Sequence, residues 1–193
     1  MPRDFQKYFI AIVPEGEIQE KVTEIKHLLK ETFNLKYALK SPAHITLKMP
    51  FSWDENRESR LLGRLSHFFS QELPFELTLS GIGRFGRKVI YVKVCDQEKL
   101  RQLQKNLGLF CRTRLQLDAE LSDHRYQPHM TLAYKDTKEK FFEDYLRFIK
   151  GKVPAFSMAV RDVALLKREN RRWYVCHRFA LAADIQDSPI NLS

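Results

Sequence analysis

The sequence contains one short motif twice: a histidine, an apolar residue, a threonine and a leucine. The copies are His44-Ile45-Thr46-Leu47 and His129-Met130-Thr131-Leu132. In a β-strand, successive side chains point to opposite faces, so each histidine shares a face with its threonine and the apolar residues share the other. Two such strands facing each other across a groove would place two imidazoles and two hydroxyls around a single anionic group. This arrangement fits a phosphodiester.

Histidine titrates near pH ~6.5, so one imidazole can be neutral and the other protonated at neutral pH, as concerted acid-base chemistry requires. In displacement at phosphorus the attacking and leaving oxygens lie roughly in line, so base and acid must flank the phosphate. The motifs therefore predict His44 and His129 as the catalytic pair, in either order. Thr46 and Thr131 are predicted to donate hydrogen bonds to the non-bridging oxygens. Strand propensity alone explains a single threonine, but its recurrence beside a histidine favours the functional role.

Residues beside the motifs are further candidates for substrate binding. By the same alternation, Lys48 and Lys135 fall on the groove side and are expected to attract the phosphate, with a solvated lysine near a strand end as the alternative. Arg84 and Phe85 are candidates for holding a phosphate and stacking a base, or for packing within a linker. No metal or cofactor is expected, because His-x-Thr is not a metal-ligand spacing and no carboxylate cluster stands beside either motif.

Apolar patterning predicts alternating strands and helices along the chain. Compact or alternating apolar runs predict strands, and apolar residues at spacings of three and four predict helices. The glycine-bearing segment 81–86 is expected to join two strands, because it precedes no helix and lacks Gly-Lys-Ser/Thr. The predicted strands are 8–13, 43–49, 75–80, 88–95, the second motif strand, 156–167 and 172–182, and the predicted helices are 17–33, 55–70, 97–115 and 138–150.

The order strand, helix, motif strand, helix, strand occurs once before and once after residue 86. The motif histidines are 129 − 44 = 85 positions apart. An internal duplication accounts for this order, with repeats at about 7–86 and 87–183 in a single domain, 1–183, and a flexible tail at 184–193. We therefore predict an α+β fold of two lobes related by a pseudo-twofold axis. Each lobe is expected to be an antiparallel sheet with helices on its outer face, and the lobes to form a central groove.

Composition indicates a globular protein with a polyanionic partner. Lysine and arginine number 33 against 24 acidic residues in a chain of 193, a net charge of +9, although a basic protein without such a partner has the same composition. The three cysteines form no C-x-x-C pair, so neither a disulfide framework nor a cysteine zinc site is suggested. No stretch approaches the ~20 apolar residues that span a bilayer. We expect a cytoplasmic monomer without a membrane partner.

The chain resembles the 2H phosphoesterases, a group that includes the bacterial and archaeal 2'-5' RNA ligases and the RNA 2',3'-cyclic phosphodiesterases. Two His-x-Thr-x motifs define that group, and Pro128 before the second copy also matches it. A further match is Gly81-x-Gly83-x-Phe85 followed by the strand 89–94, which is similar to the segment that joins the lobes in the RNA ligase branch.

The sequence departs from the RNA ligase pattern at two positions. Members often carry an aromatic residue five positions after the first motif histidine and an arginine five after the second, where this chain has Met49 and Tyr134. Phe51 and Lys135 lie close by and are expected to substitute. Tyr134 and Phe51 therefore join the predicted substrate-binding residues.

The resemblance and the motifs together predict a metal-independent hydrolase acting on RNA 2',3'-cyclic phosphate or 2'-5' phosphodiester bonds. Ligation would be the reverse reaction, and RNA or a nucleotide the partner. Two alternatives stay open. One is a phosphodiesterase for small cyclic nucleotides that uses the same residues, and the other is an RNA-binding module without useful catalysis.

Overall fold

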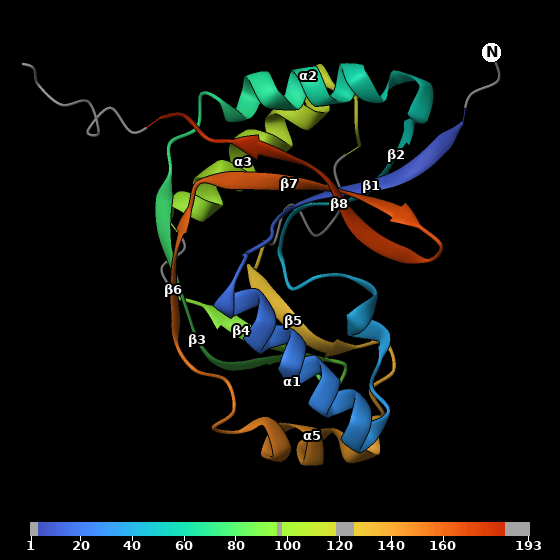
Figure 1. Cartoon of the computed structure of the whole chain (residues 1–193), viewed down its shortest axis with the longest axis vertical. Coiled ribbons are helices and arrows are strands. Elements are labelled where there is room, and N and C mark those ends of the chain that lie inside the picture. Colours follow the sequence, from blue (N-terminus) through green and yellow to red (C-terminus); the bar gives the residue numbers. More distant parts are fainter. Residues whose placement is uncertain (1–3, 96–97, 119–125, 184–193) are drawn as a thin grey trace, which may run out of the picture.

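A curled antiparallel sheet organises the computed structural model, which describes residues 4–95, 98–118 and 126–183 (Figure 1). The tail predicted to be flexible, 184–193, lies outside the described residues. Within them, the eight strands follow the order β6-β3-β4-β5-β2-β1-β7-β8. Their bounds are β1 Phe5–Ile12, β2 Ile45–Asp54, β3 Phe75–Phe85, β4 Val89–Val94, β5 His129–Tyr134, β6 Phe156–Val160, β7 Asp162–Glu169 and β8 Arg172–Ala180.

The sheet consists of two four-stranded halves that meet between the motif strands. The register of β2 and β5 pairs Ile45 with Met130, the apolar residues that follow the two motif histidines. The first half-sheet contains β1, β2, β7 and β8, and the second contains β3, β4, β5 and β6. The predicted α+β class with antiparallel sheets and a central groove is therefore confirmed.

Helices cover one face of each half-sheet. They are α1 Glu17–Phe33, α2 Glu58–Phe69, α3 Glu98–Arg114 and α5 Phe142–Ile149, with short 3₁₀ helices η1 Tyr37–Lys40, η2 Glu55–Arg57 and η3 Glu139–Phe141. α2 contacts β8 and α3 contacts β2, whereas α1 contacts β5 and α5. Figure 1 accordingly shows α2 and α3 at one end of the molecule and α1 and α5 at the other. Every helix in the described ranges is too short or too polar to traverse a membrane.

The main core lies between the sheet and these helices. It contains the apolar residues of both motifs, Ile45 and Leu47 with Met130 and Leu132, each at most 2% exposed. A smaller cluster on the opposite face of the sheet contains Phe9, Ala11, Val13, Ala164 and Leu166. The motif strands are thus anchored by one face, which leaves the histidine face toward the groove.

Three predicted strand boundaries were wrong, each for a topological reason. β2 continues through Pro50 to Asp54, because the proline lies at an irregularity between the pairs Tyr8–Phe51 and Ile10–Lys48, where no regular ladder bond is required of it. β3 runs through the glycine-bearing segment to Phe85, which leaves only a short turn before β4. The predicted strand 156–167 is two strands, because β6 pairs with β3 whereas β7 pairs with β1.

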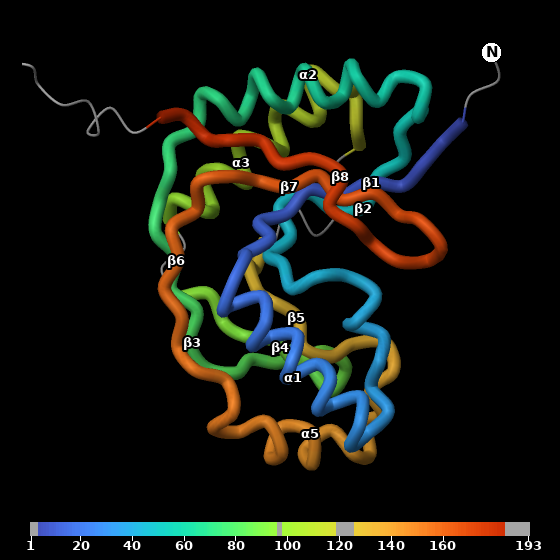
Figure 2. The backbone as a smooth tube through the Cα atoms, viewed as in Figure 1, coloured from blue at the N-terminus to red at the C-terminus, as the bar shows by residue number. Residues whose placement is uncertain are grey.

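The strand order is symmetric about the centre of the sheet, but the half-sheets do not coincide with the predicted repeats. β3 comes from the first half of the sequence and lies beside β4, while β7 comes from the second half and lies beside β1. Figure 2 shows β3 and β6 running together along one side of the molecule. Each predicted repeat thus contributes strands to the half-sheet of the other. The duplication itself remains a proposal.

Candidate active site

The pairing of β2 with β5 brings the two motifs together. Because the strands are antiparallel and Ile45 pairs with Met130, His44 lies across from Thr131 and Thr46 lies across from His129. All four residues line one cavity of about 270 Å³. The groove between the half-sheets therefore gathers the two imidazoles and the two threonines around a space suited to one small group.

Both histidines are oriented by the backbone in the same way. His44 Nδ1 lies 2.8 Å from the carbonyl oxygen of Pro42, and His129 Nδ1 lies 2.7 Å from that of Gln127. A carbonyl oxygen only accepts, so Nδ1 carries the hydrogen in each ring. In the neutral tautomer Nε2 is then an unprotonated nitrogen, able to accept a proton, and in the imidazolium it is a donor.

Burial favours the neutral form of both imidazoles in the free protein. Desolvation lowers the pKa of His44 to about 4, against the opposing effect of the Pro42 carbonyl, and the positive charge of Lys26 lowers it further. Desolvation also lowers the pKa of His129, and the Gln127 carbonyl opposes this shift. A bound anion would act in the other direction, because a negative charge nearby favours the protonated ring.

Aromatic rings hold each imidazole from the side. The Phe9 ring centroid lies 4.9 Å from that of His44. Phe85 and Tyr91 flank His129, with ring centroids at 4.8 and 5.1 Å. Phe85, predicted to stack a base, therefore lies against a catalytic candidate. These contacts restrict the imidazoles and exclude water from their faces.

A β-bulge follows each motif at the same position. On β2, Thr46 pairs with Ala11 and Lys48 pairs with Ile10, so β2 advances by two residues where β1 advances by one. On β5, Thr131 pairs with Tyr91 and Ala133 with Ile90. Beyond the bulge, the extra residue reverses which side chains point to the groove face of the sheet and which point to the core face. The residues five positions after each motif histidine, Met49 and Tyr134, consequently line the cavity.

Two of the predicted substrate-binding residues, Lys48 and Phe51, lie in the core and do not line the cavity. Lys48 is 3% exposed, and its Nζ donates a hydrogen bond to the carbonyl oxygen of Asp118, at 2.9 Å. Phe51 is 8% exposed and stacks on Tyr8 in the main core, with ring centroids 6.1 Å apart. Lys48 was predicted to face the groove by strict alternation, and that placement is wrong because the bulge turns Lys48 to the core face. Phe51 was predicted to substitute for the aromatic residue of the RNA ligase pattern, and its place in the core rules out contact with a substrate in this cavity.

The remaining predicted residues lie around the cavity or away from it. Lys135 is exposed and donates a hydrogen bond from Nζ to the Tyr37 hydroxyl at 3.0 Å, beside the Tyr134 ring that lines the cavity. Arg84 does not line the cavity. It is exposed and forms an ion pair of 2.9 Å with Glu143 on α5. The structure therefore does not bring Arg84 together with the motif residues, and its predicted contact with a phosphate stays a prediction.

Sequence reasoning missed Lys26 and Trp173, which also line the cavity. Lys26 is 2% exposed, its Nζ donates a hydrogen bond to the Ser41 carbonyl oxygen at 3.3 Å, and burial lowers its pKa to about 8. A signal was present, because Lys26 lies between Val22 and Leu29 at helical spacing on the apolar face of α1. Trp173 comes from β8 and packs edge-on against Phe9, with ring centroids 4.7 Å apart.

Two other features complete the description of the site. Among the described residues, no three His, Cys, Asp or Glu side chains gather closely enough to hold a metal ion.

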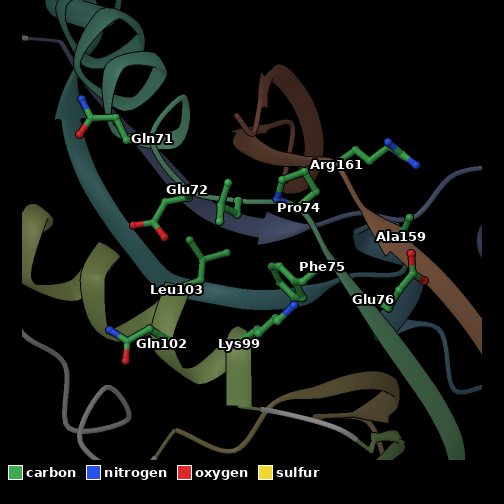
Figure 3. A pocket seen from close by; sticks show the side chains of 11 residues that line it. Gln71, Glu72, Pro74, Phe75, Glu76, Lys99, Gln102, Leu103, Ala159 and Arg161 are labelled. Carbon is green, nitrogen blue, oxygen red and sulfur yellow. The ribbon is translucent and has the colours of Figure 1, made fainter. Parts of the chain in front are cut away.

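A separate cavity of about 640 Å³ lies between α3 and the strands β3 and β6 (Figure 3). Its described lining contains no histidine, and the cations Lys99 and Arg161 are matched there by Glu72 and Glu76.

Comparison with known proteins identifies the family. The model of the 2'-5' RNA ligase superfamily matches residues 14–172, which includes both motifs and most of the sheet. The chain belongs to the 2'-5' RNA ligase superfamily. The resemblance to 2H phosphoesterases is therefore confirmed, and the family supports a phosphoesterase activity.

Relatives of this superfamily member cover nearly its whole length. A Bacillus mycoides protein named "Putative phosphoesterase" is 27% identical over 183 residues, covering 92% of this chain and 98% of the relative. A Bacillus anthracis protein of the same name is 28% identical, covering 91% and 96%. Escherichia coli LigT in its apo form has the same fold, with a TM-score of 0.63, 21% identity, and coverage of 93% and 99%. LigT has also been solved in complex with 3'-AMP (TM-score 0.60, 20% identity, coverage of 93% and 100%).

Proposed function

We propose that this superfamily member is a phosphodiesterase that opens RNA 2',3'-cyclic phosphates or cleaves 2'-5' phosphodiester bonds by two-histidine acid-base catalysis, with 2'-5' ligation as the reverse reaction. The observation that supports this proposal is the pair of imidazoles on neighbouring strands that line one cavity, each with Nδ1 held by a backbone carbonyl. The complex of LigT with 3'-AMP supports a nucleotide ligand.

In the proposed hydrolysis, His44 is the base and His129 the acid. His44 has a pKa near 4 and faces the charge of Lys26, so it remains neutral and takes a proton from water at Nε2. The water oxygen bonds to phosphorus, the bond from phosphorus to one ribose oxygen breaks, and protonated His129 gives its proton to that oxygen. Desolvation lowers the pKa of His129, whereas His44 also faces the positive charge of Lys26, so a bound anionic substrate protonates His129 more readily than His44.

The threonine hydroxyls are proposed to bind the non-bridging oxygens. Thr46 and Thr131 lie across the strand pair from the opposite histidine, so each oxygen would meet one hydroxyl and one imidazole. Such donors stabilise the charge that is redistributed in the transition state. No step requires a metal, and the described residues that line the site offer imidazole, hydroxyl and ammonium groups rather than carboxylates. We therefore propose metal-independent catalysis.

The size of the cavity favours a second candidate, a phosphodiesterase for small cyclic nucleotides. Its volume of about 270 Å³ lies just below the range for ligand pockets, ~300–1,000 Å³, so it accommodates little more than a terminal nucleotide group. Both candidates use the same catalytic groups and differ in whether the substrate continues outside the cavity.

The test is incubation of the protein with a 2',3'-cyclic nucleotide and with an oligoribonucleotide ending in a 2',3'-cyclic phosphate, both in EDTA, with products identified by phosphorus NMR. We expect His44→Ala and His129→Ala each to lower kcat by roughly 10²- to 10⁴-fold while the ligand Kd changes little. The control is His67→Ala, since His67 is exposed on α2. Binding without turnover in the wild type would establish the non-catalytic alternative instead. A requirement for one particular cation after EDTA treatment would refute metal independence.

A further inference from the structure

A second groove adjoins the histidine cavity. It has a volume of about 690 Å³ and is lined by α1, by the segment from Lys36 to Pro42 that includes η1, and by the first residues of β8. Thr23, Lys26, His27 and Lys30 reach it from α1, and their spacing of three and four places them on one helix face. Lys26, Ser41 and Trp173 line both spaces, so the groove begins where the cavity ends.

The charge of this groove is of one sign. Five cations line it, and its described lining contains no carboxylate: Lys26, Lys30, Lys36, Lys40 and Arg172. In the described part of the chain, none of the five takes part in a salt bridge. Asp136 approaches the same segment, but its Oδ2 accepts from the backbone N–H groups of Lys36 and Tyr37 at 2.7 and 2.6 Å. In the cavity of Figure 3, by contrast, acidic and basic residues balance.

Lys26 is the strongest indication that an anion belongs here. It is 2% exposed, and one carbonyl oxygen at 3.3 Å is its hydrogen-bond partner among the described residues. A buried ammonium without a carboxylate is costly, because little water remains to solvate it. Its position on the wall common to cavity and groove lets one ligand charge, or two neighbouring ones, compensate it.

Two aromatic side chains stand beside these cations. Trp173 lies on the shared wall, and Tyr174, the next residue of β8, is 48% exposed and lines the groove. A cationic groove with accessible aromatic rings is the usual means of binding single-stranded nucleic acid, because phosphates contact the cations and bases stack on the rings. The residue types of the groove thus match a nucleotide chain better than an isolated anion.

We propose that this basic groove binds the phosphate that precedes the reacting one, so that the protein recognises the terminal nucleotide of an RNA strand by the phosphates on both sides of its ribose. The inference rests on the proposed function and adds a substrate requirement to it. The reacting phosphate occupies the histidine cavity, the preceding phosphate contacts the lysines of α1 and η1, and Lys26 lies between the two.

The experiment compares three substrates that share one reacting group. They are a nucleoside 2',3'-cyclic phosphate, the same nucleotide with a 5'-phosphate, and an oligoribonucleotide ending in that nucleotide. The 5'-phosphate supplies the preceding phosphate without a strand, so it separates a two-phosphate subsite from a longer strand contact. The variant is Lys30→Ala combined with Lys36→Ala, and the matched control is Lys99→Ala, which removes a lysine from the charge-balanced cavity.

For the wild type we expect kcat/KM to be roughly tenfold higher for both substrates that carry the preceding phosphate. In the double variant this preference falls to about twofold or less, and the dependence of log KM on log salt for the oligonucleotide becomes shallower by about 0.7, the change expected for the one preceding phosphate that the two lysines no longer neutralise. The Lys99→Ala control should keep both the wild-type substrate preference and the wild-type salt dependence. A preference shown by the oligonucleotide alone would replace the two-phosphate subsite with a longer strand contact.

The inference and the proposed function fail in different ways. If the wild type hydrolyses the cyclic nucleotide but the double variant keeps the full preference, the groove proposal is wrong and the catalytic one stands. If none of the three substrates is hydrolysed, the catalytic proposal is wrong. The groove proposal can then be tested by fluorescence anisotropy of the labelled oligonucleotide. The proposal predicts that the double variant binds the oligonucleotide more weakly than Lys99→Ala does, and equal binding by the two would overturn it.

Discussion

Replacement of Lys26 by methionine is expected to stabilise the protein while it weakens anion binding. The two side chains have similar length, so packing changes little. Burial lowers the pKa of Lys26 from 10.5 to about 8, and a free-energy difference of about 1.36 kcal/mol for each factor of ten makes the buried charge cost roughly 3 kcal/mol near neutral pH. Loss of the hydrogen bond to the Ser41 carbonyl destabilises the variant by about 1 kcal/mol and so reduces this gain. The net expectation is a gain of roughly 2 kcal/mol.

The assay is urea unfolding followed by circular dichroism, at several pH values. Between the folded pKa near 8 and the ordinary value of 10.5, the unfolded chain binds more protons at Lys26 than the folded one, so wild-type stability rises with pH. The advantage of Lys26→Met should therefore be largest below pH 8 and shrink towards pH 10.5. The control is Lys30→Met, one turn further along α1 and exposed, which should change stability by less than about 0.5 kcal/mol.

Ligand binding should narrow the difference in stability between the two proteins. A ligand present at about 100 times its Kd adds roughly 2.7 kcal/mol to the stability of the protein that binds it. With a 5'-phosphorylated 2',3'-cyclic nucleotide and inactive His129→Ala backgrounds, the lysine protein should gain more than its Lys26→Met counterpart. The reasoning would be refuted if Lys26→Met were less stable than wild type at pH 7, or if its advantage did not change with pH.

Three further predictions concern the histidine cavity. The pH profile of kcat/KM should be bell-shaped, with its acidic limb near the His44 pKa of about 4 and its basic limb below 6.5, because His129 must be protonated and its pKa is lowered. Thr46→Val should lower kcat by roughly 10²-fold with little change in stability, measured by steady-state kinetics and thermal unfolding. Gly83→Ala should cost about 1–3 kcal/mol and lower kcat, because a Cβ there would lie 2.2 Å from the ring of Tyr91, which contacts His129.

Matched substitutions control for unspecific effects. Thr78→Val changes an exposed threonine of β3 and should leave kcat unaltered. Gly63→Ala, in α2 with no atom within 4 Å of the added Cβ, should stabilise the helix by roughly 0.5–1 kcal/mol. Activity that kept rising above pH 8 would contradict the histidine assignment. A Thr46→Val protein with full kcat would remove the threonine from the reaction, and a stable, active Gly83→Ala protein would show that Tyr91 does not position His129.

Much of the fold was predictable because local pattern and tertiary structure agree. The apolar face of α1, Val22, Ile25 and Leu29, is buried in the main core, and the helix ends at Asn34 in the left-handed conformation. The α+β class followed from the alternation of such segments. The distribution of strands between the half-sheets did not follow from the sequence. No local pattern shows whether β3 or β7 pairs with strands of its own repeat or with strands of the other repeat.

The site was predictable only as far as the period of two holds. His44 and Thr46 lie on one face because nothing interrupts the strand between them, and the same is true of His129 and Thr131. Beyond the threonines, the bulges reverse the side-chain alternation, so extrapolation from the motif placed Lys48 on the wrong face. A bulge depends on the register of the neighbouring strand and not on the residue types within it, so a single sequence does not reveal it.

The recurrence of the bulge at the same place in both motifs gives it a functional meaning. In a regular β2, Lys48 would point into the groove and Met49 to the core, and the bulge exchanges these two positions. The bulge on β5 likewise brings Tyr134 to the cavity, while Ala133 is buried. The cavity therefore has apolar and aromatic walls beside its imidazoles, which desolvate them and lower their pKa values. The cation that faces His44 stands on α1, at Lys26, where the cavity opens into the basic groove.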